Sequence, residues 1–345
     1  MSLSSGGKRI LAIDVGVGTQ DILVYEEGRI PDNNIKMVLP SQTQVLAKKV
    51  REGSGDIFLY GETMGGGPFS RAILERIAKG DRVSATPRAA MTIRDDPEEV
   101  KEEGIEIVQA SCDTNCQRIE TQDVDFNLIK DVLKNVEEEF AFDAIGIAVQ
   151  DHGHEKGKSD RVFRFEKIKE TLKRGATLAD FMYEEPPEVY ARMNGALRTI
   201  QEVHAGSACV VDTKIAAVAG AVFDIKERPV LCVDVGNGHT MAAIVGKGDA
   251  VLGLFEHHTN ILEAEMFDRL LEKFIKGDLA NEEIFEGGGH GCYVGEGVDI
   301  NRILVTGPKR ALLKDSKFKI EYANPFGDVM MAGPAGIVSM ILRHR

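Results

Sequence analysis

A strand-turn-strand pattern that occurs twice constrains the fold of this chain more than any other feature. The first copy, residues 9–25, is an apolar strand that ends in Asp14, a turn that contains Gly16 and Gly18, and a second apolar strand. The second copy, residues 230–245, aligns with the first without a gap. A repeat of this length predicts two similar domains, each with a hairpin at the same place.

Identical residues in the two copies include the aspartate and both glycines of the turn. The matched pairs are Leu11 and Leu231, Asp14 and Asp234, Val15 and Val235, Gly16 and Gly236, Gly18 and Gly238, and Gly28 and Gly248. Glycines let a backbone approach a ligand closely, and the N–H groups of a turn can bind an anion together. A carboxylate beside such a turn suits a metal ion that bridges phosphates. A plain hairpin is the alternative for one copy alone, and the duplication favours two turns that face one polyphosphate.

Composition narrows the class of protein. A chain of 345 residues with 43% hydrophobic side chains predicts about two domains with ordinary cores. Its net charge of −13 argues against nucleic acid or an anionic membrane as a partner. No apolar run reaches the ~18 residues of a membrane span, and residues 1–7 resemble a polar leader more than a signal peptide. Five cysteines in a chain of this size indicate reduced thiols and a cytoplasmic protein.

Strands and helices alternate along the chain, which predicts an α/β architecture. A short strand is expected at 40–50, and an amphipathic helix at 125–140 leads into a buried strand at 144–149. The acidic run at 95–99 is typical of a solvated helix start. Small residues at 212–222 predict a helix that packs closely on another backbone.

Two loops are candidate substrate sites. The first loop follows the buried strand and carries four polar side chains: Gln150, Asp151, His152 and His154. Ligands bind at the carboxyl ends of strands in open α/β sheets. The second loop contains Gly66 and feeds a helix start, which is an anion-binding arrangement. A solvated turn and a flexible connector are the respective alternatives.

Five segments, taken in order, resemble the nucleotide-binding fold shared by acetate and sugar kinases, heat-shock chaperone ATPases and actin. Residues 14–19 and 234–240 are similar to the two phosphate motifs of that superfamily, and 304–307 is similar to its adenosine motif. Residues 212–220 and 328–336 resemble its two connecting helices. The resemblance spans nearly the whole chain and implies two ribonuclease H-like domains with a nucleotide cleft between them.

The same resemblance implies domain boundaries and cofactors. The first domain would cover 8–211, the second 212–327, and 328–345 would be a connecting helix that returns to the first domain. Mg²⁺ and ATP would be the cofactors, with Asp14 and Asp234 beside the metal ion. The nucleotide would contact residues of the motifs: Gly16, Gly18, Thr19, Gly236, Asn237, Gly238, Thr240, Gly307 and Gly333. Pro308 stands where the adenosine motif usually has a second glycine, so the base preference stays open.

Residues 145–153 resemble the strand and Gln-x-His-Gly turn that faces the phosphoryl acceptor in carbohydrate kinases. By this likeness, Asp151 or His152 would orient or deprotonate the acceptor hydroxyl. The substrate would contact three further residues: Gln150, His154 and Gly66. The predicted function is therefore phosphoryl transfer to a small molecule. An ATPase switch that remodels a partner protein and a phospholigand-binding protein without turnover are the alternatives, and a homodimer is left open.

The chain is also similar to a mainly archaeal family, some of whose members are labelled as related to pyruvate formate-lyase activating enzymes. Radical activators of that kind carry Cys-x3-Cys-x2-Cys for an iron–sulfur cluster. Here Cys112 and Cys116 are followed by Ile119 at the third position. We therefore expect ordinary thiols and no radical activator.

Four further side chains offer zinc ligands in principle: His257, His258, His290 and Cys292. Their spacing is not diagnostic, and contact with substrate or solvent explains them equally well. The glycine-rich segment 287–292 is expected to be a mobile loop.

Overall fold

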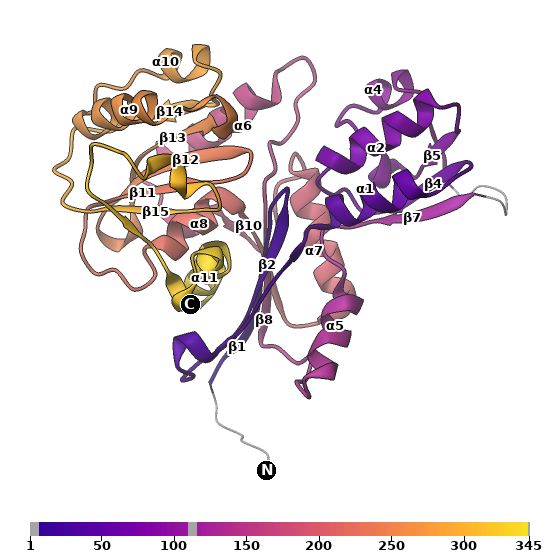
Figure 1. The fold of residues 1–345 in the computed structure, drawn as a ribbon, viewed down its shortest axis with the longest axis horizontal. Coiled ribbons are helices and arrows are strands. Elements are labelled where there is room, and N and C mark those ends of the chain that lie inside the picture. The colour runs from indigo at the N-terminus through magenta and orange to yellow at the C-terminus, as the bar shows by residue number, and fades with distance from the viewer. Residues whose placement is uncertain (1–6, 110–115, 344–345) are drawn as a thin grey trace.

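The computed structural model of the chain describes residues 7–109 and 116–343, and its strands form two six-stranded sheets and one four-stranded sheet (Figure 1). The strands of the first large sheet are β1 (Arg9–Val15), β2 (Thr19–Glu26), β3 (Ile35–Pro40), β8 (Ala144–Val149), β9 (Met182–Tyr183) and β10 (Ser207–Asp212). Those of the second are β11 (Val230–Val235), β12 (His239–Val245), β13 (Val251–His258), β14 (Gly291–Tyr293), β15 (Ile303–Thr306) and β16 (Ile320–Tyr322).

The two large sheets share a five-stranded core, to which β9 adds an edge strand in the first sheet and β14 adds one at the opposite edge in the second. Their orders are β3-β2-β1-β8-β10-β9 and β14-β13-β12-β11-β15-β16. In the first, β1, β2 and β3 are antiparallel neighbours, and β8 and β10 continue parallel to β1. In the second, β11, β12 and β13 are antiparallel, and β15 and β16 continue parallel to β11. This arrangement confirms the predicted α/β fold with two similar domains of ribonuclease H-like topology.

Two helices of small residues pack on each other between the large sheets. They are α8 (Thr213–Ala221) and α11 (Ala332–Arg343). A Cβ on Gly220 would lie 1.7 Å from the carbonyl oxygen of Ala332, and a Cβ on Gly336 would lie 1.9 Å from that of Ala216. Glycine is therefore required at both crossing points, and the predicted close packing of residues 212–222 is confirmed. The largest buried core includes these helices and strands of both sheets.

The outer faces of the two large sheets are covered by separate helices. Cores there include α5 (Phe126–Asn135) and α7 (Ala191–Val203) on the first sheet, and α9 (Ala264–Lys276) and α10 (Asn281–Glu286) on the second. A further helix, α6 (Asp160–Leu172), follows β8 in the chain but lies beside α10 and β14 of the second unit (Figure 1). The domain boundary at 211 stays a prediction. Helix α6 precedes that boundary in the sequence but packs against the second unit.

The four-stranded sheet is an insertion between β3 and β8 with its own core (Figure 1). Its strands are β4 (Ile57–Gly61), β5 (Val83–Ala85), β6 (Ile105–Ile107) and β7 (Gln117–Thr121), all parallel, in the order β6-β5-β4-β7. Its helices are α1 (Gln42–Glu52), α2 (Gly67–Ala78), α3 (Pro87–Ala90) and α4 (Pro97–Glu102). Asp96 caps α4 and accepts a hydrogen bond from the N–H of Glu98 at 2.9 Å, so a helix starts in the predicted run. The prediction that the run is solvated holds for residues 97–99 but was wrong for Asp95, which is half-buried.

Two sequence predictions were wrong. Residues 42–52 form helix α1 and not a strand, because Leu46, Ala47 and Val50 lie on one helical face and are buried in the core of the insertion. The segment 287–292 is not an open loop. His290 is only 2% exposed, and β14 begins at Gly291, against the ring of Phe165.

Short 3₁₀ turns complete the chain: Pro31–Asn33, Leu178–Phe181, Lys247–Asp249, Thr259–Ile261, Arg310–Leu313, Pro325–Gly327 and Val329–Met331. Within residues 7–109 and 116–343, the helices are too short or too polar to cross a membrane.

Candidate functional site

The two glycine turns close in the same way and face each other. The N–H of Gly16 donates to the carbonyl three residues later at 2.8 Å, and the N–H of Gly236 does the same at 3.0 Å. A Cβ on Gly18 would lie 3.2 Å from the side-chain nitrogen of Asn237, so the turns approach closely. The duplicated sequence thus produces two equivalent turns on opposite sides of one space.

That space is a cavity of about 400 Å³, which is within the usual range for small-molecule sites. It is lined by most of the residues that the sequence singled out: Asp14, Gly16, Thr19, Gly66, Gln150, His152, Asp234, Gly236, Asn237, Gly238, Gly307 and Gly333. The candidate phosphate, adenosine and substrate segments therefore meet in one place.

Four predicted site residues do not line the cavity: Asp151, His154, Gly18 and Thr240. The hydroxyl of Thr240 is buried and lies 2.9 Å from that of Thr259. The Asp151 carboxylate accepts hydrogen bonds from the N–H groups of Gly153, at 2.8 Å, and Met193, at 3.0 Å. Asp151 therefore fixes its loop against the start of α7, and its carboxylate is occupied by backbone N–H groups outside the cavity lining.

Three carboxylates converge at the hairpins. Asp14 accepts a hydrogen bond from the hydroxyl of Thr213 at 2.6 Å. Asp21, which the sequence reading missed, pairs with Asp14 across β1 and β2 and has one oxygen with no hydrogen-bond partner. Burial, and then the charge of Asp234, raise the pKa of Asp14 to about 7. Burial and the nearby Asp14 raise the pKa of Asp21 to about 8.

Two glycines leave space beside these carboxylates that the side chain of any other residue would fill. A Cβ on Gly333 would lie 2.0 Å from an Asp14 oxygen, and a Cβ on Gly307 would lie 2.7 Å from an Asp234 oxygen. Carboxylate oxygens are the ligands that Mg²⁺ prefers, and a cation would relieve the repulsion that raises the pKa of Asp14. The residues present therefore fit a hard divalent cation.

Lys214 is a further cavity residue that the sequence reading missed. It stands in the first turn of α8, is 8% exposed, and donates from Nζ to Asp234 at 2.6 Å. Burial lowers its pKa, but the Asp234 carboxylate, with smaller effects from Glu256 and Asp14, raises the pKa above its usual value, so the ammonium stays charged. Its charge lies where an anionic ligand would need a counter-charge.

The insertion supplies the opposite wall of the cavity. Residues 91–95 of the insertion line it beside Gly66, next to Arg192 of α7. Burial, followed by the charge of Asp160, raises the pKa of Asp95 to about 6. Arg192 donates to both oxygens of Asp123 at 2.8 Å and to the carbonyl of Gln150, also at 2.8 Å, so it holds the substrate loop against the insertion.

A buried ion network joins the two units beside the cavity. Arg164 of α6 donates to Glu256 of β13 at 2.9 Å and to Asp212, at the start of α8, at 2.6 Å. The amide of Gln150 donates to the other oxygen of Glu256 at 3.0 Å. The candidate substrate loop is thereby connected to the second sheet.

The comparison with protein families supports the resemblance seen in the sequence. Residues 64–312 match a family described as "Putative pyruvate format-lyase activating enzyme (DUF1786)". The chain belongs to DUF1786. No curated protein matches this sequence.

Solved structures similar to this DUF1786 chain have low identity and low structural overlap. Component A of (R)-2-hydroxyglutaryl-CoA dehydratase from Acidaminococcus fermentans is 10% identical, with 96% of each chain covered and a TM-score of 0.36. A ROK family glucokinase from Streptomyces griseus, in complex with glucose and AMPPNP, is 11% identical. The match covers 96% of this chain and 97% of that chain, with a TM-score of 0.35.

Among the cysteines that the structure describes, none lines the cavity. Cys209, Cys232 and Cys292 are buried free thiols. Of the remaining pair, Cys116 is disulfide-bonded, so the expectation of an ordinary thiol there was wrong, and Cys112 lies outside the described residues. Ile119, at the third position of the radical-activator pattern, is fully buried in the core of the insertion.

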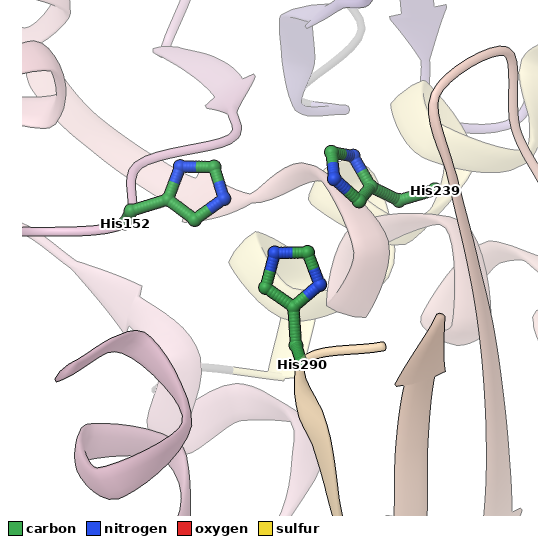
Figure 2. A group of neighbouring side chains, drawn as sticks. All are labelled: His152, His239 and His290. Atoms are coloured by element: carbon green, nitrogen blue, oxygen red, sulfur yellow. The ribbon is translucent and has the colours of Figure 1, made fainter. Parts of the chain in front are cut away.

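The histidines group differently from the candidate zinc set. The Cys292 thiol lies 3.6 Å from the carbonyl of Leu279, and His257 turns toward the carbonyl of His258 at 3.2 Å. His290 instead lies beside His152 and His239 (Figure 2). The sequence left a zinc site of His290 with Cys292 open without favouring it, and the structure places the two side chains against different neighbours.

We expect Asp21→Asn to stabilise the metal-free protein, increasingly so as the pH rises. The folded state keeps the Asp21 proton up to a pKa of about 8, whereas the unfolded state releases it near its ordinary value. Wild-type stability therefore falls as the pH rises between those values, and the asparagine variant lacks that loss. Urea unfolding with a chelator should show a gain about 4 kcal/mol larger at pH 8 than at pH 5, because these pH values lie between the two pKa values and each pH unit is worth about 1.4 kcal/mol. A gain that is equal at both pH values contradicts the raised pKa.

Proposed function

We propose that this DUF1786 protein is a Mg²⁺-ATP-dependent phosphotransferase that acts on a small molecule. The observation that carries the proposal is the pair of equivalent glycine turns that face each other across one cavity, with Asp14 and Asp234 at their starts. Phosphoryl transfer depends mainly on positioning and on neutralisation of charge. When bound, Mg²⁺ would supply that neutralisation on the phosphate oxygens.

The residues of the chain divide into three roles under this proposal. Asp14 and Asp234 hold the metal ion, directly or through water, and the N–H groups of the two turns hold phosphates. Lys214 stands between the hairpins and offers a positive charge to the same phosphates. Gly307 and Gly333 keep the backbone close to both aspartates, so that these carboxylates stay accessible.

The acceptor would lie on the side of the cavity formed by Gln150, His152 and Gly66. Asp95 lines the same cavity, and its pKa of about 6 is suited to a group that accepts a proton near neutral pH. Asp95 therefore replaces Asp151 as the proposed base, because both oxygens of Asp151 accept hydrogen bonds from backbone N–H groups.

An ATPase switch is the second candidate, and the Arg164 network favours it. Arg164 and Gln150 connect both units beside the cavity, so opening of the cavity would have to break buried ion pairs. Phosphate release from ATP at full rate without any small molecule would support the switch. Release that needs a small hydroxylated or carboxylated metabolite would support the phosphotransferase.

We expect Mg²⁺-ADP and Mg²⁺-ATP to bind with one site per chain. Isothermal calorimetry on the purified chain measures this directly, and thermal unfolding gives an independent readout, because a ligand of the folded state raises stability. Omission of Mg²⁺ should weaken binding, since the metal offsets repulsion between the phosphates and the two aspartates. No binding of either nucleotide at millimolar concentration with Mg²⁺ present would overturn the assignment.

A further inference from the structure

Three histidines from distant parts of the chain converge beside the cavity, with their rings directed toward a common centre (Figure 2). His152 follows β8 of the first unit, His239 begins β12 at the second turn, and His290 precedes β14. One nitrogen from each ring lies within 4.8 Å of the others. A fourth histidine, His258, has its ring centre 4.6 Å from that of His239 and 4.9 Å from that of His290.

Two of these rings lack partners that buried imidazoles normally have. Neither ring nitrogen of His290 has a hydrogen-bond partner, and Nε2 of His239 has none. Buried polar atoms without partners are rare in folded proteins, and each costs free energy. Several unpaired ring nitrogens at one centre imply a single partner that they share.

The protonation state of the rings suits a metal ion. Burial lowers the pKa of His152, His239 and His290 to about 3, so all three are neutral near pH 7. Neutral imidazole is the form that binds metal ions. The fully buried Glu256 carboxylate attracts positive charge at all three rings and is itself held by Arg164 and Gln150.

We propose that His152, His239 and His290 bind one divalent transition-metal ion of the Zn²⁺ class. Imidazole nitrogens suit Zn²⁺ and similar ions, whereas Mg²⁺ prefers oxygen ligands, so this site is separate from the aspartates. Tetrahedral Zn²⁺ with bonds of about 2.0–2.1 Å needs nitrogens about 3.4 Å apart. Ring nitrogens within 4.8 Å reach that spacing by a small closing movement of the side chains.

The fourth coordination position faces the cavity. His152 and His239 line the cavity and His290 lies behind them, so the side of the ion opposite His290 is open to a ligand. A three-histidine ion with an open position binds water or an anionic oxygen. The ligand class is therefore a carboxylate or phosphate oxygen of a molecule in the cavity.

The three histidines come from both units, so a bound ion would link the units. His152 belongs to the first sheet's loop, while His239 and His290 belong to the second sheet. The bound ion joins the two units across the cavity and favours its closed form. Binding should therefore stabilise the whole chain and not only one loop.

Cobalt(II) titration of the chelator-treated full chain, without nucleotide, tests the proposal. Cobalt replaces zinc in such sites and gives visible absorption bands whose intensity reports tetrahedral geometry. We expect one equivalent to bind with intense bands, to be displaced by Zn²⁺, and to raise the unfolding temperature by about 5 °C or more. Because nucleotide is absent, failure here leaves the proposed phosphotransferase untouched.

Variants locate the ion. His152→Ala, His239→Ala and His290→Ala should each weaken cobalt binding at least about 100-fold, since loss even of an outer-shell partner costs 10–100-fold. His154→Ala is the matched control, because His154 lies in the same loop but belongs to a separate group with Asp95 and Asp160. It should bind cobalt as the wild type does.

Three results would overturn the proposal. They are no stoichiometric cobalt binding by the wild-type chain, weak bands typical of octahedral coordination, and loss of binding in His154→Ala with full binding in the other three variants. The wild-type titration decides the first two even where a histidine variant fails to fold.

Discussion

Asp14→Asn and Asp234→Asn are each expected to lower turnover of Mg²⁺-ATP at least about 100-fold. Each substitution removes one carboxylate charge beside the proposed metal ion, and metal-based charge stabilisation is worth several kcal/mol in the transition state. A loss of about 2.7 kcal/mol corresponds to a factor of 100 in rate. Steady-state phosphate release, or product formation once the acceptor is known, is the measurement.

The two variants should differ in stability, which separates the loss of chemistry from the loss of fold. Asp14 has a pKa raised to about 7, first by burial, so a neutral asparagine there should not destabilise the metal-free protein. Asp234→Asn leaves the buried Lys214 ammonium without its partner and should destabilise the fold.

Asp315→Asn is the matched control for both variants, because the Asp315 side chain is 80% exposed and remote from the cavity. Equal turnover in the wild type and both cavity variants would show that the hairpins take no part in phosphoryl transfer.

The duplicated hairpins were predictable because a glycine turn leaves a local signature. Gly16 and Gly236 each close the same backbone hydrogen bond, and that requirement is visible in six or seven consecutive residues. The helix at 126–135 was predictable for the same kind of reason, since apolar residues three or four positions apart define its buried face. Sequence reasoning works where the physical cause lies within a few residues.

The residues that sequence reasoning missed owe their places to long-range pairing. Asp21 reaches the cavity because β2 pairs with β1 in a register that sets it opposite Asp14. Lys214 reaches it because α8 begins beside the second turn. His290 meets His152 only through the packing of β14 and α6. In each case strand pairing or helix packing brings the partners together. Local residue spacing does not encode such contacts.

The insertion was missed for a different reason. Its strands β5 and β6 are three residues each, too short to give a period, and the charged segment around α4 resembles a solvated surface. That segment nevertheless supplies Arg94 and Asp95 to the cavity. A polar segment is compatible with a surface and with a ligand site alike.

Arg164→Met is expected to cause the largest loss of stability, about 3–5 kcal/mol. Arg164 is 3% exposed and pairs with Glu256, which is fully buried, and with Asp212, which is 5% exposed. Methionine fills much of the volume but leaves two buried carboxylates without a counter-charge. Urea unfolding monitored by circular dichroism measures the change.

The double variant Arg164→Met with Glu256→Gln separates charge from packing. Burial by itself raises the pKa of Glu256, but the Arg164 guanidinium, together with His290 and His239, lowers that pKa below its usual value. The ion pair therefore depends strongly on charge. Glutamine removes one orphaned charge and keeps an acceptor for the amide of Gln150. The double variant should therefore be more stable than Arg164→Met alone.

Arg51→Met, which breaks the exposed pair between Arg51 and Glu75, is the control for loss of an arginine in general and should leave stability unchanged. If Arg164→Met is no less stable than this control, the buried network does not hold the two units together. The case for a switch that must break this network to open would then fail, while the hairpins and their aspartates would keep their proposed role.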